Sequence, residues 1–159
     1  MTFFAGLAFF VLAISQLSSY LINTHLDINE TYVVNSFIHF THIRNLGGIF
    51  GIFHGMIWSF AVFSAVILLA VIIYLATHKS AKLYEYLCLG CIVGAGASNI
   101  LDRILYGGVV DFIDIQQIPY WNYVFNTADV MIHVGLWPLL FITLYYQNRT
   151  GSSADSVGG

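Results

Sequence analysis

The stretch MIWSFAVFSAVILLAVIIYLA (residues 56–76) contains no charged residue and is long enough to cross a lipid bilayer. A helix needs about 20 apolar residues to span the hydrocarbon core. Three other largely apolar stretches occupy residues 3–22, 83–101 and 128–147. Because an isolated strand would leave its backbone groups unsatisfied in lipid, all four stretches are predicted to be transmembrane helices.

The composition favours the same class of protein. Of the 159 residues, 58% are hydrophobic and 8% are charged, and the mean hydropathy is +0.80. We therefore predict an all-α membrane protein with four transmembrane helices and a small extended or β element on the outer face, formed by the loops at 23–55 and 104–127. Residues 23–44 are also expected to form an interfacial segment, with Phe37, Ile38 and Phe40 dipping into lipid. The sequence has no basic patch of the kind that would indicate nucleic-acid binding.

The domain organisation and the orientation follow from length and charge. We expect one integral membrane domain over residues 1–150 and a flexible Gly/Ser-rich tail over residues 151–159. Lys79 and Lys82 lie in the short connection between the second and third spans, and Arg149 follows the fourth. The positive-inside rule then places that connection and both termini in the cytoplasm. Both long loops are predicted to face outward.

Two aspartates, Asp111 and Asp129, lie at the edges of apolar segments. Ionisable groups at membrane depth are costly and persist mainly where they serve a reaction or a pathway. Two carboxylates that a loop brings together at a membrane surface are suited to aspartyl protease chemistry.

A purely structural interpretation also exists for Asp129. Asn126 is a good N-cap residue for the fourth helix, and Asp129 would then be its third residue, which the helix dipole favours. A cap does not explain Asp111, nor the gathering of polar residues at one end of the bundle. Those residues are Asn45, Asn99, Arg103, Asp111, Asn126 and Asp129.

The third span ends in GAGASNILDR (residues 94–103). Its small residues should let helices approach closely. Asn99 and Arg103 are four residues apart and hence lie on one face. The structural alternative is that Arg103 snorkels toward the interface and pairs with Asp102.

Several blocks of the sequence together resemble the lipoprotein signal peptidases, also called type II signal peptidases. They are SNILDR (98–103), GGVVDFID (107–114), FNTAD (125–129) and the earlier block NLGGIF (45–50). The order of these blocks, their spacing and the four spans all fit that family. The resemblance therefore covers nearly the whole chain before the tail. The resemblance implies a catalytic pair of Asp111 and Asp129. It also implies a set of positions that line or support the site, namely Asn45, Gly47, Asn99, Arg103, Asn126 and Ala128.

The resemblance also implies a reaction. The expected function is that of an intramembrane aspartyl endopeptidase that removes signal peptides from prolipoproteins, cutting before a diacylglyceryl-modified cysteine. The expected partners are that prolipoprotein and membrane lipid, without cofactor, metal or nucleic acid, and the protein is expected to be a monomer. The expected location is the bacterial inner membrane, with the active site near its outer face. The alternative is a non-proteolytic four-helix protein that uses the two aspartates as an ion or proton relay.

One stretch departs from the family pattern. The family carries Asp-Gln-x-x-Lys in its first span, and this chain has Ser15 and Ser19 in place of the acid and the base. Joint loss of a structural ion pair costs far less than loss of one partner. The other interpretation is a divergent paralogue with a different substrate. Because both aspartates remain, we predict an active enzyme and favour the loss of a structural pair.

Two further groups of residues could suggest other chemistry. Cys88 and Cys91 form a C-x-x-C motif inside the third span, where a thiol behaves as a small hydrophobe. Histidines of the first long loop could in principle bind a metal ion, but a site made only of imidazoles cannot be assigned from spacing. We favour an interfacial role for these residues, which are His25, His39, His42 and His54.

Overall fold

The computed structural model describes residues 1–47, 57–78 and 80–155, with side chains up to residue 147. Within these residues, four helices and four strands follow one another. In order they are α1 (Thr2–His25), β1 (Thr31–Val33), β2 (Ile38–Asn45), α2 (Ile57–Thr77), α3 (Leu83–Tyr106), β3 (Val109–Ile115), β4 (Val124–Phe125) and α4 (Thr127–Asp155). The four predicted spans are confirmed, since each helix is long and apolar enough to cross a membrane. The backbone of α4 continues as helix to Asp155, past the predicted domain end at residue 150.

Helix α3 is the centre of the bundle and packs against each of the other three helices. A Cβ atom at Gly94 would collide with the backbone carbonyl of Ala8 in α1. At Gly96 a Cβ atom would lie 2.9 Å from a methyl carbon of Leu68 in α2. The prediction that small residues of the third span permit close helix packing is therefore confirmed.

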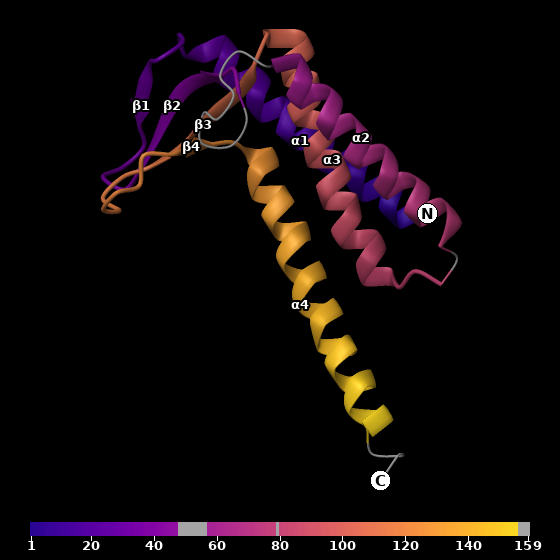
Figure 1. The fold of residues 1–159 in the computed structure, drawn as a ribbon. Helices are drawn as coiled ribbons and strands as arrows, with labels where there is room; N and C mark the ends of the chain where they lie inside the picture. The colour runs from indigo at the N-terminus through magenta and orange to yellow at the C-terminus, as the bar shows by residue number, and fades with distance from the viewer. Residues whose placement is uncertain (48–56, 79, 156–159) are drawn as a thin grey trace.

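The outer faces of the helices carry exposed apolar side chains, as a lipid environment requires. Phe9 of α1, Val62 of α2 and Phe141 of α4 are all more than half exposed. Helix α3 is the most enclosed of the four spans. Helix α4 diverges from the other helices toward its C-terminal end, and the N-terminus and the last turn of α4 lie at the end of the bundle away from the sheet (Figure 1).

The four strands form one antiparallel sheet in the order β1-β2-β3-β4, which projects from one end of the bundle (Figure 1). All four strands fall within the two loops where a β element is predicted. The buried face of the sheet packs Val110 and Phe112 against Ile22 of α1. This contact fixes the sheet to the end of the bundle where α1 and α3 end and α4 begins.

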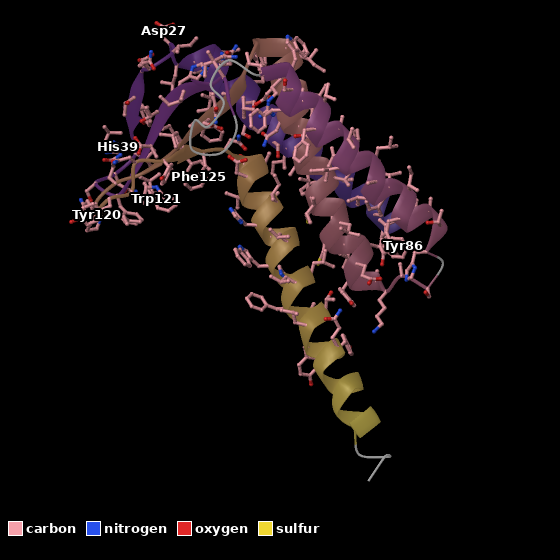
Figure 2. All side chains as sticks on the ribbon, in the orientation of Figure 1. Asp27, His39, Tyr86, Tyr120, Trp121 and Phe125 are labelled. Carbon is pink, nitrogen blue, oxygen red and sulfur yellow. The ribbon has the colours of Figure 1, made fainter. Side chains whose placement is uncertain are left out.

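The aromatic side chains of the sheet divide into two groups. Phe40 is half-buried and packs edge-on against Phe112, with ring centroids 5.8 Å apart, and its contact with lipid stays a prediction. Phe37 is 46% exposed. Between β3 and β4 the chain carries Tyr120 and Trp121 to the tip of the sheet, far from the helices (Figure 2). The tip is thus an exposed aromatic surface.

Candidate active site

Asp111 lies at the buried start of β3, where Val109 to Phe112 are all enclosed. Its carboxylate is 3% exposed. One oxygen accepts a hydrogen bond from Asn45 Nδ2 at 2.9 Å, and the other accepts one from Asn126 Nδ2 at 2.7 Å. Asp111 is therefore held between an amide from β2 and an amide that precedes α4.

A β-bulge in β2 decides which residue of that strand reaches Asp111. Before the bulge Phe40 pairs with Ile113, and after it Ile43 pairs with Asp111, so β2 gains one residue over β3. Side chains opposite each other in an antiparallel pair share a face. With the bulge, Asn45 lies opposite Val109 on the face of Asp111, and Arg44 lies on the other face. Without the bulge, Arg44 would lie opposite Val109 on the face of Asp111, and Asn45 would lie on the other face. Bulges often re-aim a side chain in this way.

Asn126 and Asp129 cap the start of α4 reciprocally. Asn126 Oδ1 accepts a hydrogen bond from the backbone N–H of Asp129 at 2.9 Å, and an Asp129 carboxylate oxygen accepts one from the backbone N–H of Asn126 at 3.3 Å. The N-cap role predicted for Asn126 is confirmed, and the bond that its N–H donates to Asp129 completes a capping box. The cap and the candidate site are compatible, because the Nδ2 of the same Asn126 reaches Asp111.

Asn99 and Arg103 of α3 complete the network. Asn99 Nδ2 donates to Asp129 at 3.1 Å, and Asn99 Oδ1 accepts from Asn126 Nδ2 at 3.3 Å. Arg103 is 7% exposed and donates to the backbone oxygens of Asn99 at 2.8 Å and Gly47 at 3.3 Å. Arg103 therefore ties α3 to the segment that follows β2.

The remaining two predicted residues support the site from its edge. The backbone N–H of Gly47 donates to Asn45 Oδ1 at 3.0 Å, which orients the Asn45 amide so that its nitrogen faces Asp111. Ala128 is 2% exposed and packs against Val11 and Ala95 between α1 and α3. Ala128 thus fixes the position of the helix that carries Asp129.

The environment of Asp111 favours its protonated form. The pKa of Asp111 is raised to about 7, chiefly because burial removes the carboxylate from water and secondarily because the Asp129 carboxylate lies nearby. Hydrogen bonds from Asn45 and Asn126 oppose this shift. A carboxyl that keeps its proton near neutral pH beside a second carboxylate is equipped for acid–base chemistry.

The structural alternative in which Arg103 pairs with Asp102 is wrong, because Arg103 donates to Asn99 and Gly47. The Asp102 carboxylate is 1% exposed and accepts hydrogen bonds from Gln16 Nε2 at 2.7 Å, Ser19 Oγ at 2.9 Å and the Val110 backbone N–H at 3.1 Å. This cluster around Asp102 was not predicted from the sequence. Two features of the sequence could have indicated it: Asp102 is an acid within an apolar span, and the first span contains a polar stretch at residues 15–19.

The cysteines of the C-x-x-C motif and the described histidines of the first long loop make no hydrogen bond to Asp111 or Asp129. Cys88 and Cys91 are both buried in α3 as free thiols. His42 is 1% exposed, and its Nδ1 lies 2.9 Å from the Leu26 carbonyl oxygen. Within the described ranges, no group of three metal-ligating side chains comes together. His54 lies outside the described residues.

Comparison with known proteins places the chain in a family. Residues 7–146 match the model of the family described as Signal peptidase (SPase) II. The chain is similar to the lipoprotein signal peptidase of Moorella thermoacetica, with 38% identity over 145 residues that cover 86% of this chain and 92% of that protein. It is 29% identical over 143 residues to the lipoprotein signal peptidase of Bacillus velezensis, covering 89% and 93% respectively.

A solved structure agrees with these sequence matches. A bacterial membrane enzyme determined by the in meso method at 2.3 Å resolution has a TM-score of 0.79 and 29% identity, over 89% of this chain and 87% of that chain. The fold and the matches define a multi-pass membrane protease. The chain belongs to the signal peptidase II family, and the resemblance inferred from its motifs is confirmed.

Proposed function

We propose that the chain is an aspartyl endopeptidase that removes signal peptides from diacylglyceryl-modified prolipoproteins, with Asp111 and Asp129 as its catalytic pair. The observation that carries this proposal is the position of Asn126. Its side chain bonds to Asp111, and its backbone N–H and side-chain oxygen both bond to Asp129. Both acids therefore meet at a single residue.

The two carboxylates divide the chemistry between them. Two acids at one site cannot both ionise cheaply, so near neutral pH the pair retains one proton. Asp111 holds that proton, in keeping with its raised pKa. Asp129, as the ionised partner, takes a proton from a water molecule that attacks the scissile carbonyl. The acid polarises the carbonyl and then gives its proton to the leaving amine.

The surrounding residues hold the two carboxylates in place and do not themselves take up or release a proton. The Asn45, Asn99 and Asn126 amides donate to carboxylate oxygens and remain uncharged over the whole pH range. Arg103 adds a permanent positive charge close to both carboxylates. This charge partly offsets the repulsion that two ionised acids would experience.

The location of the pair suits a substrate held in a membrane. Both aspartates lie where the sheet meets the bundle, whereas an ion or proton relay would place acids along a path through the helices. An open hollow between α2, α3 and α4, lined by Val71, Leu89 and Leu139 but also by Glu85, lies toward the end of the bundle away from the aspartates. It offers room only for a part of the signal helix that is remote from the scissile bond. The exposed aromatic tip of the sheet matches side chains that favour membrane interfaces.

The proposed orientation puts the sheet and the aspartates on the outer side. The basis is Lys82 in the α2–α3 connection, at the end of the bundle away from the sheet. Labelling of a single introduced cysteine at Ser80 in intact cells checks this orientation. Accessibility from outside would reverse it.

The function is tested with purified protein and a matched pair of peptides that carry one lipobox sequence. One peptide has a diacylglyceryl-modified cysteine, and the control has the same cysteine unmodified. We expect cleavage of the lipidated peptide alone, with mass spectrometry placing the new N-terminus at the lipidated cysteine. Equal cleavage of both peptides would overturn the proposed substrate. Cleavage of neither would overturn the proposed activity.

A further inference from the structure

The carboxylate of Asp102 is nearly as buried as any polar group in the described part of the chain, yet all three of its hydrogen-bond donors are uncharged. A buried ionisable group is costly unless its hydrogen bonds are satisfied. The side chains of Gln16 and Ser19 come from α1, and the backbone N–H of Val110 comes from β3. The cluster therefore joins three elements at one carboxylate.

Local geometry explains why Asp102 can reach β3. Helix α3 ends at Tyr106, and Gly107 takes a left-handed conformation with φ of 72°, which reverses the chain. β3 then starts at Val109 and passes beside the last turn of α3. The Val110 N–H that Asp102 binds belongs to the residue immediately before Asp111.

Gln16 extends this connection along α3. The same Gln16 nitrogen that donates to Asp102 also lies 3.1 Å from the backbone oxygen and 3.0 Å from the hydroxyl of Ser98. Ser98 directly precedes Asn99, which donates to Asp129. Ser98, next to Asn99, is thus bonded directly to Gln16 of α1, and Val110, next to Asp111, is linked to α1 through Asp102.

We propose that Asp102 is a positioning residue for the reaction, which holds β3 against α1 and α3 so that the Asp111 carboxylate stays aligned with Asp129, with Gln16 and Ser19 as its neutral donors. The inference rests on the proposed function, since it assumes that Asp111 reacts. In this chain Gln16 and Ser19 of α1 would support Asp102, in the stretch where the family pattern has an acid and a base.

Asp102 also influences Asp111 through its charge. The charged or ionisable groups that act on Asp111 are Asp129 of α4 together with Arg103 and Asp102 of α3. The negative charge of Asp102 adds to the upward shift of the Asp111 pKa. Removing that charge should therefore lower the Asp111 pKa, and the pair should lose its proton at a lower pH.

The first test compares two alanine variants on the same face of α1. Ser15 and Ser19 are 2% and 3% exposed, but among the described residues the Ser15 hydroxyl has no hydrogen-bond partner, whereas the Ser19 hydroxyl bonds Asp102. We expect Ser19→Ala to lower kcat about tenfold with little change in KM, since the lost bond is to a carboxylate. Ser15→Ala should match the wild type. Equal activity of the two variants would overturn the proposal.

The second test removes the carboxylate itself. Asp102→Asn keeps the shape of the side chain but turns an N–H group toward the donors. The matched control is Asp114→Asn, which removes the same charge from β3. In the described part of the chain, the Asp114 carboxylate accepts a side-chain hydrogen bond from Thr41 alone, at 2.7 Å. We expect Asp102→Asn to lower kcat about 100-fold and to move the alkaline limb of the kcat profile to lower pH. The control should show neither effect.

The outcomes separate this proposal from the proposed function. If Asp111→Asn abolishes cleavage but Asp102→Asn has the kcat and pH profile of the wild type, only the positioning role fails. If Asp111→Asn cleaves normally, the proposed function itself fails. If Asp102→Asn does not fold, the Ser19→Ala and Ser15→Ala pair decides the matter.

Discussion

The molecule contains two buried polar clusters at the same end of the bundle, and adjacent residues of β3 connect them. In one cluster Asp111 and Asp129 share Asn126 and are flanked by Arg103. In the other, Asp102 stands alone among Gln16, Ser19 and Val110. Burial in itself does not make a carboxylate reactive. The difference lies in a second acid close enough to compete for one proton.

The largest effect is expected from removing either member of the catalytic pair. Asp111→Asn and Asp129→Asn should each reduce cleavage by at least about 1,000-fold, because losing one member removes most of the joint effect. Both variants should still fold, as judged by gel filtration and circular dichroism. If Asp129→Asn still cleaves the substrate, Asp129 serves only as a helix cap. The two clusters would then not differ in having a second reactive acid.

The next prediction separates the two roles of Asn126. Asn126→Ser keeps a capping oxygen for α4 but cannot reach Asp111 with an amide. Its thermal stability should stay near that of the wild type while its activity falls strongly. Asn126→Ala should lose activity and also about 1 kcal/mol of stability, because the cap is lost. Melting temperatures and kcat measured side by side check both statements. Full activity of Asn126→Ser would mean that the amide contact to Asp111 is dispensable.

A smaller effect concerns stability against pH. The folded-state pKa of Asp111, about 7, lies above its ordinary value of 3.8, so the folded protein binds a proton that the unfolded chain releases. Stability from this group is present at low pH and is lost as pH rises through about 7. Asp111→Asn cannot ionise. Its melting temperature relative to the wild type should therefore be higher at pH 8 than at pH 5. An unchanged difference would contradict a protonated Asp111.

The smallest expected effect concerns the altered first span. Both serines are buried, as their placement within the span predicts, and Ser19 faces Asp102. A lysine at position 19 would meet that carboxylate, whereas an aspartate at position 15 would add an unpaired buried acid. We expect Ser15→Asp alone to be the worst variant and the double change with Ser19→Lys to turn over ordinary substrates at about the wild-type rate. A changed choice between two lipobox substrates would instead indicate specialised recognition.

Much of the fold could be predicted from the sequence, for physical reasons. The hydropathy of the four spans leaves few alternatives in lipid. The cap made by Asn126 and Asp129 depends only on neighbouring residues, so local pattern suffices. The pairing of Asp111 with Asp129 is predicted by the resemblance of two nearby blocks, residues 107–114 and 125–129, to the lipoprotein signal peptidases.

Other features depend on long-range geometry that no local pattern contains. The bulge after Phe40 changes the register by one residue and so exchanges the faces of Arg44 and Asn45. Two of the three partners of Asp102 come from α1, more than eighty residues away in the chain. Sequence proximity suggested Arg103 instead, but helix geometry sends that side chain toward Asn99 and Gly47.

The pH dependence of kcat/KM for the lipidated peptide tests most directly whether Asp111 and Asp129 act as one pair that shares a proton. With Asp111 protonated and Asp129 ionised the enzyme is active, and loss of the Asp111 proton stops the reaction. We therefore predict an alkaline limb with its midpoint at about pH 7, where the Asp111 pKa lies. A kcat/KM that stays constant from about pH 6 to pH 9 would contradict the account.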